Sequence, residues 1–306
     1  MHHGWLLATD ISQALPGAVQ CRPMTEPVPL YPAIEALLLA GDIEEKPAAV
    51  QALYAAWQQR SCLRDAATPL YAVPEPGRPL RPTLVAPAAL PRRGVGTREG
   101  HAALIHAIAH IEFNAINLAL DAAWRFRDMP DAFVDDWLRI AAEEAGHFQL
   151  LRRRLQALGY DYGDFPAHNT LWEMALKTDH DVLVRMALVP RVLEARGLDA
   201  TPPIQHKLRS MGDLDTVAVL DIVLRDEIGH VRVGNYWFTM LCDARGLDPL
   251  ETFRQLLRDY HVGELRGAYN LEARRDAGFS EFELTMLQDF AVTREPGEKA
   301  NYASTV

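Results

Sequence analysis

Cysteine is scarce in this chain, and the three cysteines present lie far apart at Cys21, Cys62 and Cys242. They are odd in number and form no closely spaced pair, which excludes a dense disulfide framework and a thiolate metal motif. A protein of this composition suits a reducing compartment. We therefore expect a cytoplasmic protein.

Positive charge is also in deficit. The chain has 31 Lys and Arg residues against 41 Asp and Glu residues, for a formal net charge of −10. An acidic surface of this kind argues against a nucleic acid or an anionic membrane as the main partner, because both are polyanions. No uninterrupted apolar window of about 18 residues occurs, and no basic stretch near residue 1 leads into a long apolar run. We therefore expect neither a membrane span nor a signal peptide.

Strand-like alternation of useful length is missing, whereas long helical patterns are frequent. Seven prolines fall between Pro69 and Pro91, and such a run forms neither a helix nor a central strand. We predict an extended arm that lies on the helices, with a loose linker as the alternative. Ahead of the arm, the patterns predict short helices at residues 33–40 and 48–57.

Four long helical patterns follow the arm, and together they predict an all-α four-helix bundle. Glycines provide stop signals after the second, third and fourth patterns. The expected helices cover residues 97–126, 130–158, 169–196 and 213–245. Shorter helices are expected at 249–259, 262–274 and 279–290, with a frayed tail over 295–306. The domain organisation we predict is an N-terminal helical segment with the arm (1–97), the bundle (98–246) and C-terminal helices with a tail (247–306).

Two Glu-x-x-His motifs stand out in the bundle, one at Glu144 and His147 and one at Glu227 and His230. Residues three apart on a helix share a face, so each motif directs a carboxylate and an imidazole to the same point. Two such motifs plus one glutamate from each of two further helices make the ligand set of a dinuclear metal site. The available lone glutamates are Glu112 and Glu194, which precede Glu144 and Glu227 by 32 and 33 residues. We predict a helix pair used twice, with these six side chains as metal ligands.

The glutamates at 112, 144 and 227 each interrupt an apolar stripe of their helix. An isolated buried carboxylate is costly and protonates unless it is paired or bound to a metal. A shared cation would explain three such stripes, whereas the alternative is a set of rim residues or separately satisfied core acids. Glu194 has a different context, because Pro190 lies one turn before it and predicts a kink or a π-bulge.

Each Glu-x-x-His motif is preceded by a second acid, Glu143 in the first motif and Asp226 in the second. Metal-bound histidines usually donate their other ring N–H to a carboxylate. We predict that Asp226 supports His147 and that Glu143 supports His230 across the bundle. For Glu143 the alternative is a position in water, near Asp136 and Arg139.

A polar stripe on the first bundle helix points roughly opposite to Glu112. Its members are His106, His110, Asn114, Asn117 and Asp121. We interpret it as a seam against the N-terminal arm, a contact between subunits or a solvated face rather than as a second metal site.

These motifs resemble the ferritin-like superfamily of carboxylate-bridged di-iron proteins. The segments HIEFNAI (110–116), AAEEAGH (141–147), PRVLEARGLD (190–199) and DEIGH (226–230) look more specifically like a widespread bacterial ferritin-like family of unknown function. The resemblance covers about residues 75–275. It implies the ferritin-like form of the four-helix bundle and the ligand set, and it names no substrate.

The function predicted from these residues is a dinuclear non-haem iron oxidase or hydroxylase that acts with O2 on a small organic substrate. Carboxylates and imidazoles suit iron and manganese, so two Fe ions are expected, with Mn or a mixed Fe/Mn pair as alternatives. A ferroxidase or metal-handling protein and a metal-stabilised scaffold are the competing functions. An electron-donor protein and a homodimer remain open as partners.

Overall fold

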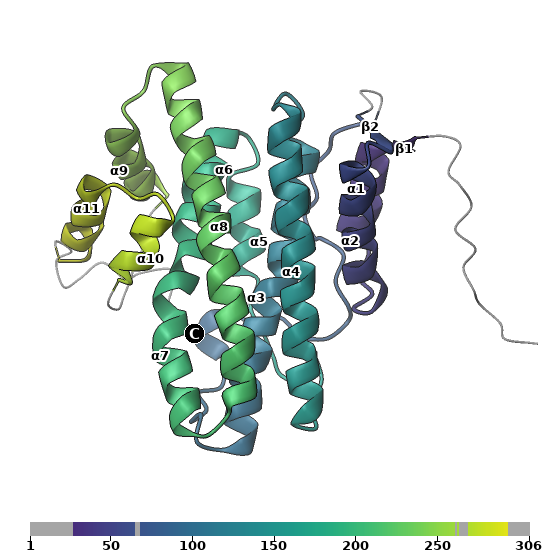
Figure 1. Cartoon of the computed structure of the whole chain (residues 1–306), viewed down its shortest axis with the longest axis vertical. Coiled ribbons are helices and arrows are strands. Elements are labelled where there is room, and N and C mark those ends of the chain that lie inside the picture. Colours follow the sequence, from purple (N-terminus) through teal and green to yellow (C-terminus); the bar gives the residue numbers. More distant parts are fainter. Residues whose placement is uncertain (1–26, 65–67, 261, 263–268, 293–306) are drawn as a thin grey trace, which may run out of the picture.

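The computed structural model of the chain is almost entirely helical (Figure 1). In the part that it describes, strand pairing is confined to the two-residue strands β1 (Val28–Pro29) and β2 (Cys62–Leu63), which pair in parallel, and to one isolated bridge. The predicted all-α class is therefore confirmed. The structure describes residues 27–64, 68–260, 262 and 269–292.

Three of the four predicted bundle helices form with nearly the predicted bounds. They are α3 (Arg98–Arg125), α4 (Asp131–Ala157) and α8 (Leu214–Arg245). Thr97 caps α3 by accepting from the Gly100 N–H, and Asp213 caps α8 by accepting from the Thr216 N–H. Gly246 ends α8 in the left-handed region at φ 67°, which a residue without a Cβ adopts at little cost. The observed bounds of these helices agree with the predicted ones because their capping residues are unambiguous in the sequence.

The third bundle helix differs from the prediction of one helix over 169–196. It is divided into α5 (Thr170–Lys177), α6 (Val182–Leu188), the π-helical segment η2 (Val189–Glu194) and α7 (Ala195–Ser210). Asp181 starts α6 afresh by accepting from the Leu183 N–H. The π-helical segment contains Pro190 and confirms the distortion predicted from it.

The predicted stop at Gly197 and Pro202–Pro203 is wrong, because α7 continues through all three residues to Ser210. A proline inside a helix lacks the N–H that would bond the carbonyl four residues earlier. For Pro202 that carbonyl belongs to Leu198, and the side-chain amide of Asn270 donates to it instead at 3.2 Å. A donor from a remote segment thus replaces the missing helical bond.

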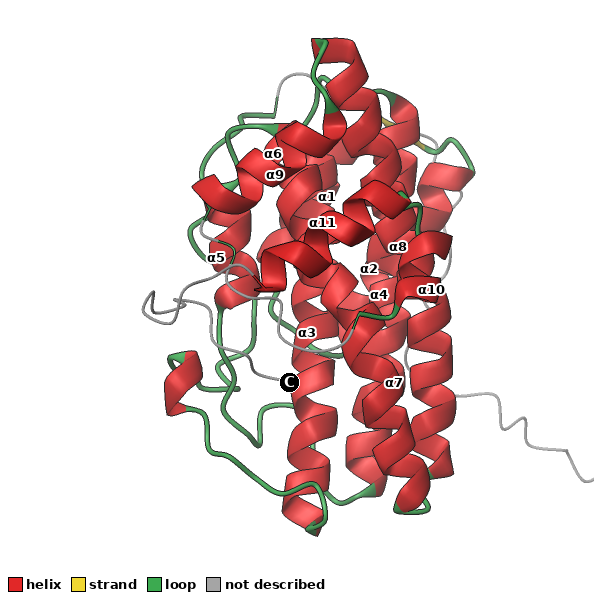
Figure 2. Ribbon diagram, turned by 90° about the vertical axis from the view of Figure 1, so that its left-hand side faces the viewer, coloured by secondary structure: helices red, strands yellow, loops and turns green. Residues whose placement is uncertain are grey.

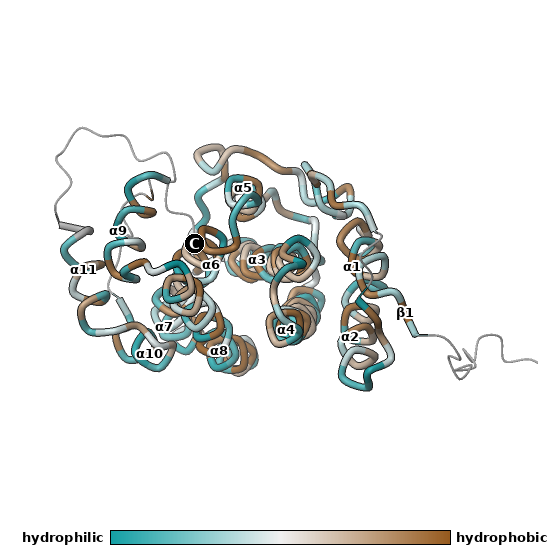
Figure 3. Tube along the Cα trace, turned by 90° about the horizontal axis from the view of Figure 1, so that it is seen from above, coloured by the Kyte–Doolittle hydropathy of each residue, from teal (hydrophilic) through white to brown (hydrophobic). Residues whose placement is uncertain are grey.

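The N-terminal helices α1 (Leu30–Leu39) and α2 (Glu45–Gln58) flank the bundle beside α3 and α4 (Figures 1 and 3). The proline-rich segment that follows is extended apart from the short helix η1 (Pro87–Ala89). It is fixed to the body by main-chain bonds from Gly77 N to Leu38 O at 2.7 Å and from Val85 N to Ala167 O at 2.8 Å. The predicted arm on the bundle is confirmed in place of a loose linker.

The C-terminal helices α9 (Pro249–Asp259), α10 (Leu271–Asp276) and α11 (Glu281–Val292) gather on the opposite side of the molecule, next to α7 and α8 (Figures 1 and 2). The helix predicted over 262–274 is shorter than expected, since α10 begins at Leu271. Part of that range, and the tail predicted over 295–306, lie outside the described residues.

The polar stripe of α3 is buried along its whole length. Asn117 Oδ1 accepts from Lys46 Nζ of α2 at 2.5 Å, and Asp121 Oδ2 accepts from Arg185 Nη1 of α6 at 2.6 Å. His110 Nδ1 lies 2.9 Å from the hydroxyl of Tyr162. The stripe is therefore an internal seam, but Asn117 forms it with α2 rather than with the predicted arm, and the alternative of a solvated face is wrong.

Burial also explains the apolar character of α3. This helix is long and apolar enough to cross a membrane by length and composition, but 78% of its most apolar window is buried inside the protein. It is the central helix of the bundle, packed against α1, α4 and α5.

Candidate metal centre

The side chains predicted as metal ligands come from separate elements and meet within the bundle. Glu112 lies on α3, Glu144 and His147 on α4, and Glu227 on α8. One ligand atom from each of these four buried residues lies within 4.8 Å of the other three. They form a group that could hold a metal ion.

Glu144 is at the middle of the group because its two carboxylate oxygens face two different histidines. Its Oε2 lies 3.3 Å from Nδ1 of His147 on its own helix, and its Oε1 lies 2.9 Å from Nδ1 of His230 on α8. Glu112 Oε2 is 3.2 Å from His147 Nδ1, whereas Glu227 Oε1 is 3.9 Å from His230 Nδ1. The two halves of the site therefore meet at Glu144, each with one further glutamate.

The other ring nitrogen of each histidine contacts a carboxylate from the opposite helix. Nε2 of His147 lies 3.2 Å from Asp226 Oδ2, and Nε2 of His230 lies 2.7 Å from Glu143 Oε2. These are the two crossed pairs predicted from the sequence. Glu143 also accepts from Arg139 at 2.9 Å, so the predicted support and the alternative position near Arg139 coexist.

Glu194, the last residue of η2, points into the same region without entering the group of four. Its Oε2 atom is buried and has no hydrogen-bond partner in the described part of the chain. Burial and the negative charge of Glu144 together raise its pKa to about 7, although the charge of His230 opposes the shift. The structure thus brings Glu194 within electrostatic reach of the other half-site.

Electrostatics in the site reflect an excess of buried carboxylates. Burial and the charge of Glu144 raise the pKa of Glu112 to about 8 and that of Glu227 well above its usual value. Burial would also raise the pKa of Glu144, but the positive charge of His230 and the hydrogen bond with His147 lower it instead. Without a cation, protons on the outer carboxylates and on the imidazoles compensate the central charge.

The donor atoms fit a metal cation. Four buried atoms of the site have no hydrogen-bond partner among the described residues, namely Glu144 Oε1, Glu194 Oε2, Glu227 Oε2 and His230 Nδ1. His230 Nδ1 and Glu144 Oε1 are close but are not aligned for a hydrogen bond, as expected of two atoms that face a common third partner. Buried polar atoms left unpaired are costly, and a cation would satisfy them. The oxygen and imidazole set matches Fe and Mn, and the buried thiols Cys62 and Cys242 are not part of it.

Comparison with known proteins shows a family but no activity. Residues 39–285 match the model of a family described as "Protein of unknown function (DUF455)". The chain belongs to this family. An "Uncharacterized protein" of Haemophilus influenzae is 54% identical to this DUF455 protein over 222 residues, which are 70% of this chain and 77% of the relative. No solved structure matches the chain significantly.

One feature of this DUF455 site escaped sequence reasoning, namely the close approach of η2 to α8. A Cβ placed on Gly234 would lie 2.4 Å from Cβ and Cγ of Pro190. Only a residue without a side chain lets the turn that ends at Glu194 sit this near the helix of Glu227. The available signal was a glycine two turns beyond Glu227 on the same helix face.

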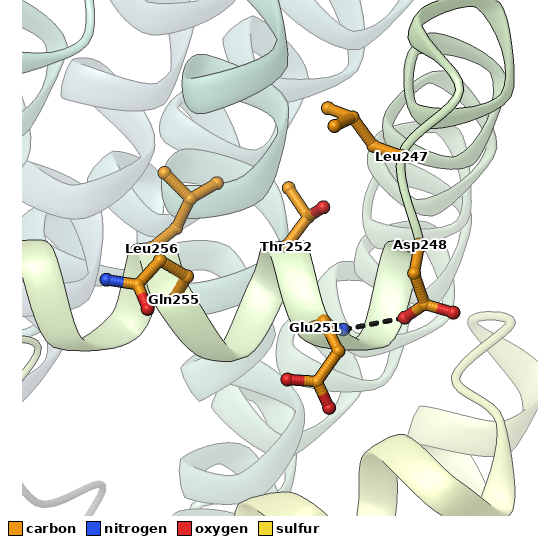
Figure 4. A pocket seen from close by; sticks show the side chains of 6 residues that line it. All are labelled: Leu247, Asp248, Glu251, Thr252, Gln255 and Leu256. Carbon is orange, nitrogen blue, oxygen red and sulfur yellow. Dashed lines mark hydrogen bonds between the residues drawn. The ribbon is translucent and has the colours of Figure 1, made fainter.

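A surface pocket of this DUF455 protein lies elsewhere, at the start of α9 (Figure 4). It is lined by Leu247, Asp248, Glu251, Thr252, Gln255 and Leu256. Asp248 there caps α9 by accepting from the Glu251 N–H at 2.8 Å. None of these residues belongs to the acid and histidine group, so the pocket contributes nothing to the candidate metal centre.

Proposed function

We propose that this protein is a dinuclear non-haem iron oxidase or hydroxylase of the ferritin-like type, which acts with O2 on a small organic substrate. The observation that carries the proposal is the matched pair of half-sites. In each, a histidine turns Nδ1 toward Glu144 and Nε2 toward a carboxylate of the opposite helix. Such pairing suits two cations that share one carboxylate. Two Fe ions are proposed, with Mn or a mixed Fe/Mn pair as alternatives.

The residues would divide between the two ions according to their contacts. Glu112 accompanies His147, Glu227 accompanies His230, and Glu144 serves both. Glu194 is proposed as the remaining carboxylate, because its Oε2 is buried and unpaired beside this group. When bound, a redox-active metal pair supplies O2 binding and electrons for the oxidation of the substrate.

The protein's own contribution is to hold the ligand atoms in their binding form. Asp226 and Glu143 each accept a hydrogen bond from the Nε2–H of one histidine, which leaves each Nδ1 lone pair free for a cation. Glu112, Glu144 and His147 are at most 3% exposed, so the fold itself keeps water from this half of the group and preserves its low dielectric.

Metal content and reaction products test the proposal. Protein from iron-supplemented cells is expected to hold about two metal ions per chain. Anaerobic loading with Fe²⁺ followed by O2 should give stoichiometric O2 uptake with retention of both ions. Accumulation of a mineral-filled assembly would instead favour a ferroxidase or storage protein. Absence of metal in folded protein would overturn all metal-dependent functions, and metal that only raises the melting temperature would favour a scaffold.

Partners and location follow from the same proposal. A hydroxylase needs electrons for each turnover, so an electron-donor protein is proposed, and a homodimer is compatible with the fold. The formal net charge of −10 supports a small molecule rather than a nucleic acid as substrate. A cytoplasmic location remains a prediction from cysteine usage.

A further inference from the structure

Two buried arginines connect the C-terminal helices to the turn that carries Glu194. Arg191 lies within η2, three residues before Glu194, and Arg274 lies on α10. Their exposed fractions are 2% and 0%, although neither belongs to the metal group. Burying a guanidinium is costly unless it has matched partners, so these contacts are specific.

Arg191 reaches from η2 into the C-terminal helices. It forms an ion pair with Glu283 of α11. Its guanidinium lies over the rings of Phe238 on α8 and Phe253 on α9, at 4.1 and 4.0 Å from their centroids. Cation–π contacts gain strength when they are desolvated. The backbone just before Glu194 is thereby anchored to α9 and α11.

Arg274 holds the backbone just after Glu194. Its Nε and Nη2 atoms bind Asp199 of α7 at 3.0 and 2.6 Å, a forked geometry that fixes the direction of the side chain. Nη2 also donates to the carbonyl of Ala195 at 3.2 Å, and Ala195 directly follows Glu194. The C-terminal segment therefore contacts both sides of this one glutamate.

The need for such anchoring comes from the helical form of η2. In a π-helical segment each backbone hydrogen bond joins residues five apart, whereas in an α-helix it joins residues four apart. Such segments are rare and mostly a single turn long. If η2 relaxed to regular α-helix, Glu194 would rotate by about 100°, the angle per residue of a helix with 3.6 residues per turn. Packing from outside the helix must then hold the carboxylate toward Glu144.

We infer that residues 270–283 act as a clamp that positions Glu194, with Arg191 and Arg274 as positioning residues. The inference rests on the proposed function, because it assumes that Glu194 binds one of two ions. It assigns a role in metal affinity to the C-terminal helices, although none of their described residues is a proposed metal ligand. The clamp acts through the backbone on both sides of Glu194, so either arginine contact should matter.

Anaerobic titration with Co²⁺, followed by its visible absorption, tests the clamp without relying on activity. Wild-type protein should bind two Co²⁺ ions per chain. Glu194→Gln should weaken one of the two ions, and Arg274→Met and Glu283→Gln should reproduce that loss, about tenfold or more, with the same spectral change. The matched control is Arg154→Met, which removes a partly buried ion pair to Asp213 at the far end of α4. It should lower stability but bind both ions normally.

The outcomes separate the clamp from the function on which it rests. If wild-type protein binds no Co²⁺, the proposed function fails, and the clamp falls with it. If Glu194→Gln loses an ion while Arg274→Met and Glu283→Gln bind both as the wild type does, the clamp alone is overturned. Should Arg274→Met not fold, the milder Glu283→Gln decides the question. Weakening in Arg154→Met equal to that in Glu283→Gln would also overturn the clamp, because general destabilisation would then explain the effect.

Discussion

Glu144 has the most demanding position in the molecule. It is fully buried, and each of its oxygens faces the Nδ1 of a histidine, one on its own helix and one on α8. No solvent is available to stabilise its charge, so its neighbours must do so. In the proposed dinuclear centre, the same arrangement would let this one carboxylate serve both cations.

Glu144→Gln is therefore expected to lose most of the bound metal. The amide keeps the shape of the side chain but removes the charge and half of its oxygen donors. Metal content should fall from about two ions per chain to fewer than about one. Elemental analysis of purified protein measures this, with Glu173→Gln, an exposed acid on α5, as the control. Wild-type metal content in Glu144→Gln would remove Glu144 from the ligand set.

Asp226 and Glu143 should affect affinity rather than the number of ions. Asp226→Asn and Glu143→Gln leave every proposed ligand in place but weaken the acceptor for the histidine Nε2 proton. Loss of such a partner typically costs about 10–100-fold in metal affinity. Competition with a chelator of known affinity would show the shift, while saturation still gives the wild-type stoichiometry. Unchanged affinity in both variants would mean that the two carboxylates serve only the fold.

At the scale of elements, η2 approaches α8 closely beside the site. Gly234 of α8 faces Pro190 of η2 with no room for a methyl group, whereas Gly229 on the same helix has open space where its Cβ would be. The two glycines thus provide a matched pair of substitutions on α8, since Gly229 lies inside the second Glu-x-x-His motif and Gly234 lies one turn after it.

Gly234→Ala is expected to separate η2 from α8 and move Glu194 away from the site. Overpacking of this kind costs about 1–3 kcal/mol of the free energy of unfolding. Gly229→Ala should be neutral or stabilising by up to about 1 kcal/mol, because alanine is the better helix former. Urea unfolding and Co²⁺ binding measured on both variants would check this. Equal stability of the two would show that Pro190 yields without cost.

A comparison of predicted and observed helices shows which structural features can be predicted from the sequence. Residues with unambiguous local chemistry, such as Thr97, Asp213 and Gly246, placed three bundle helices correctly. The prediction for the third bundle helix failed because the end of that helix depends on a remote residue. Asn270 supplies the donor that Pro202 lacks, and α7 continues. Local pattern predicts a break at a proline, and only the tertiary structure reveals the substitute.

At the scale of the whole molecule, the candidate ligands could be found from the sequence, whereas the contacts that hold them in place could not. The six proposed ligands follow helical spacing, which a sequence displays directly. The contacts of Arg191 with Glu283 and of Arg274 with Asp199 join residues about 92 and 75 positions apart and follow no repeat. Burial of the polar seam on α3 likewise depends on remote residues, Lys46 of α2 and Arg185 of α6. Sequence periodicity therefore points to the candidate ligands, whereas the contacts around them depend on tertiary packing.

His106 makes the stability of the whole fold sensitive to acid. It is buried on α3, and its Nε2 accepts from the Gly163 N–H at 2.9 Å, which requires a neutral ring. Burial lowers its pKa to about 4, helped by the charge of His110 and opposed by Asp164 and Asp161, while Tyr162 stacks on its ring. The unfolded chain takes up this proton near its ordinary pKa of about 6.5. The unfolded state thus binds more protons between these values.

Stability contributed by the neutral His106 is accordingly complete above pH 6.5 and is lost as the pH falls toward 4. The 2.5-unit difference corresponds to at most about 3 kcal/mol of the free energy of unfolding. His106→Gln retains an acceptor for Gly163 but does not titrate, so its stability should decline less over this window. Urea unfolding of chelator-treated wild-type and variant protein, at several pH values from 7.5 to 4, isolates the effect from any loss of metal. Parallel pH profiles would mean that the wild-type ring is already protonated in the fold, or that another group governs the acid response.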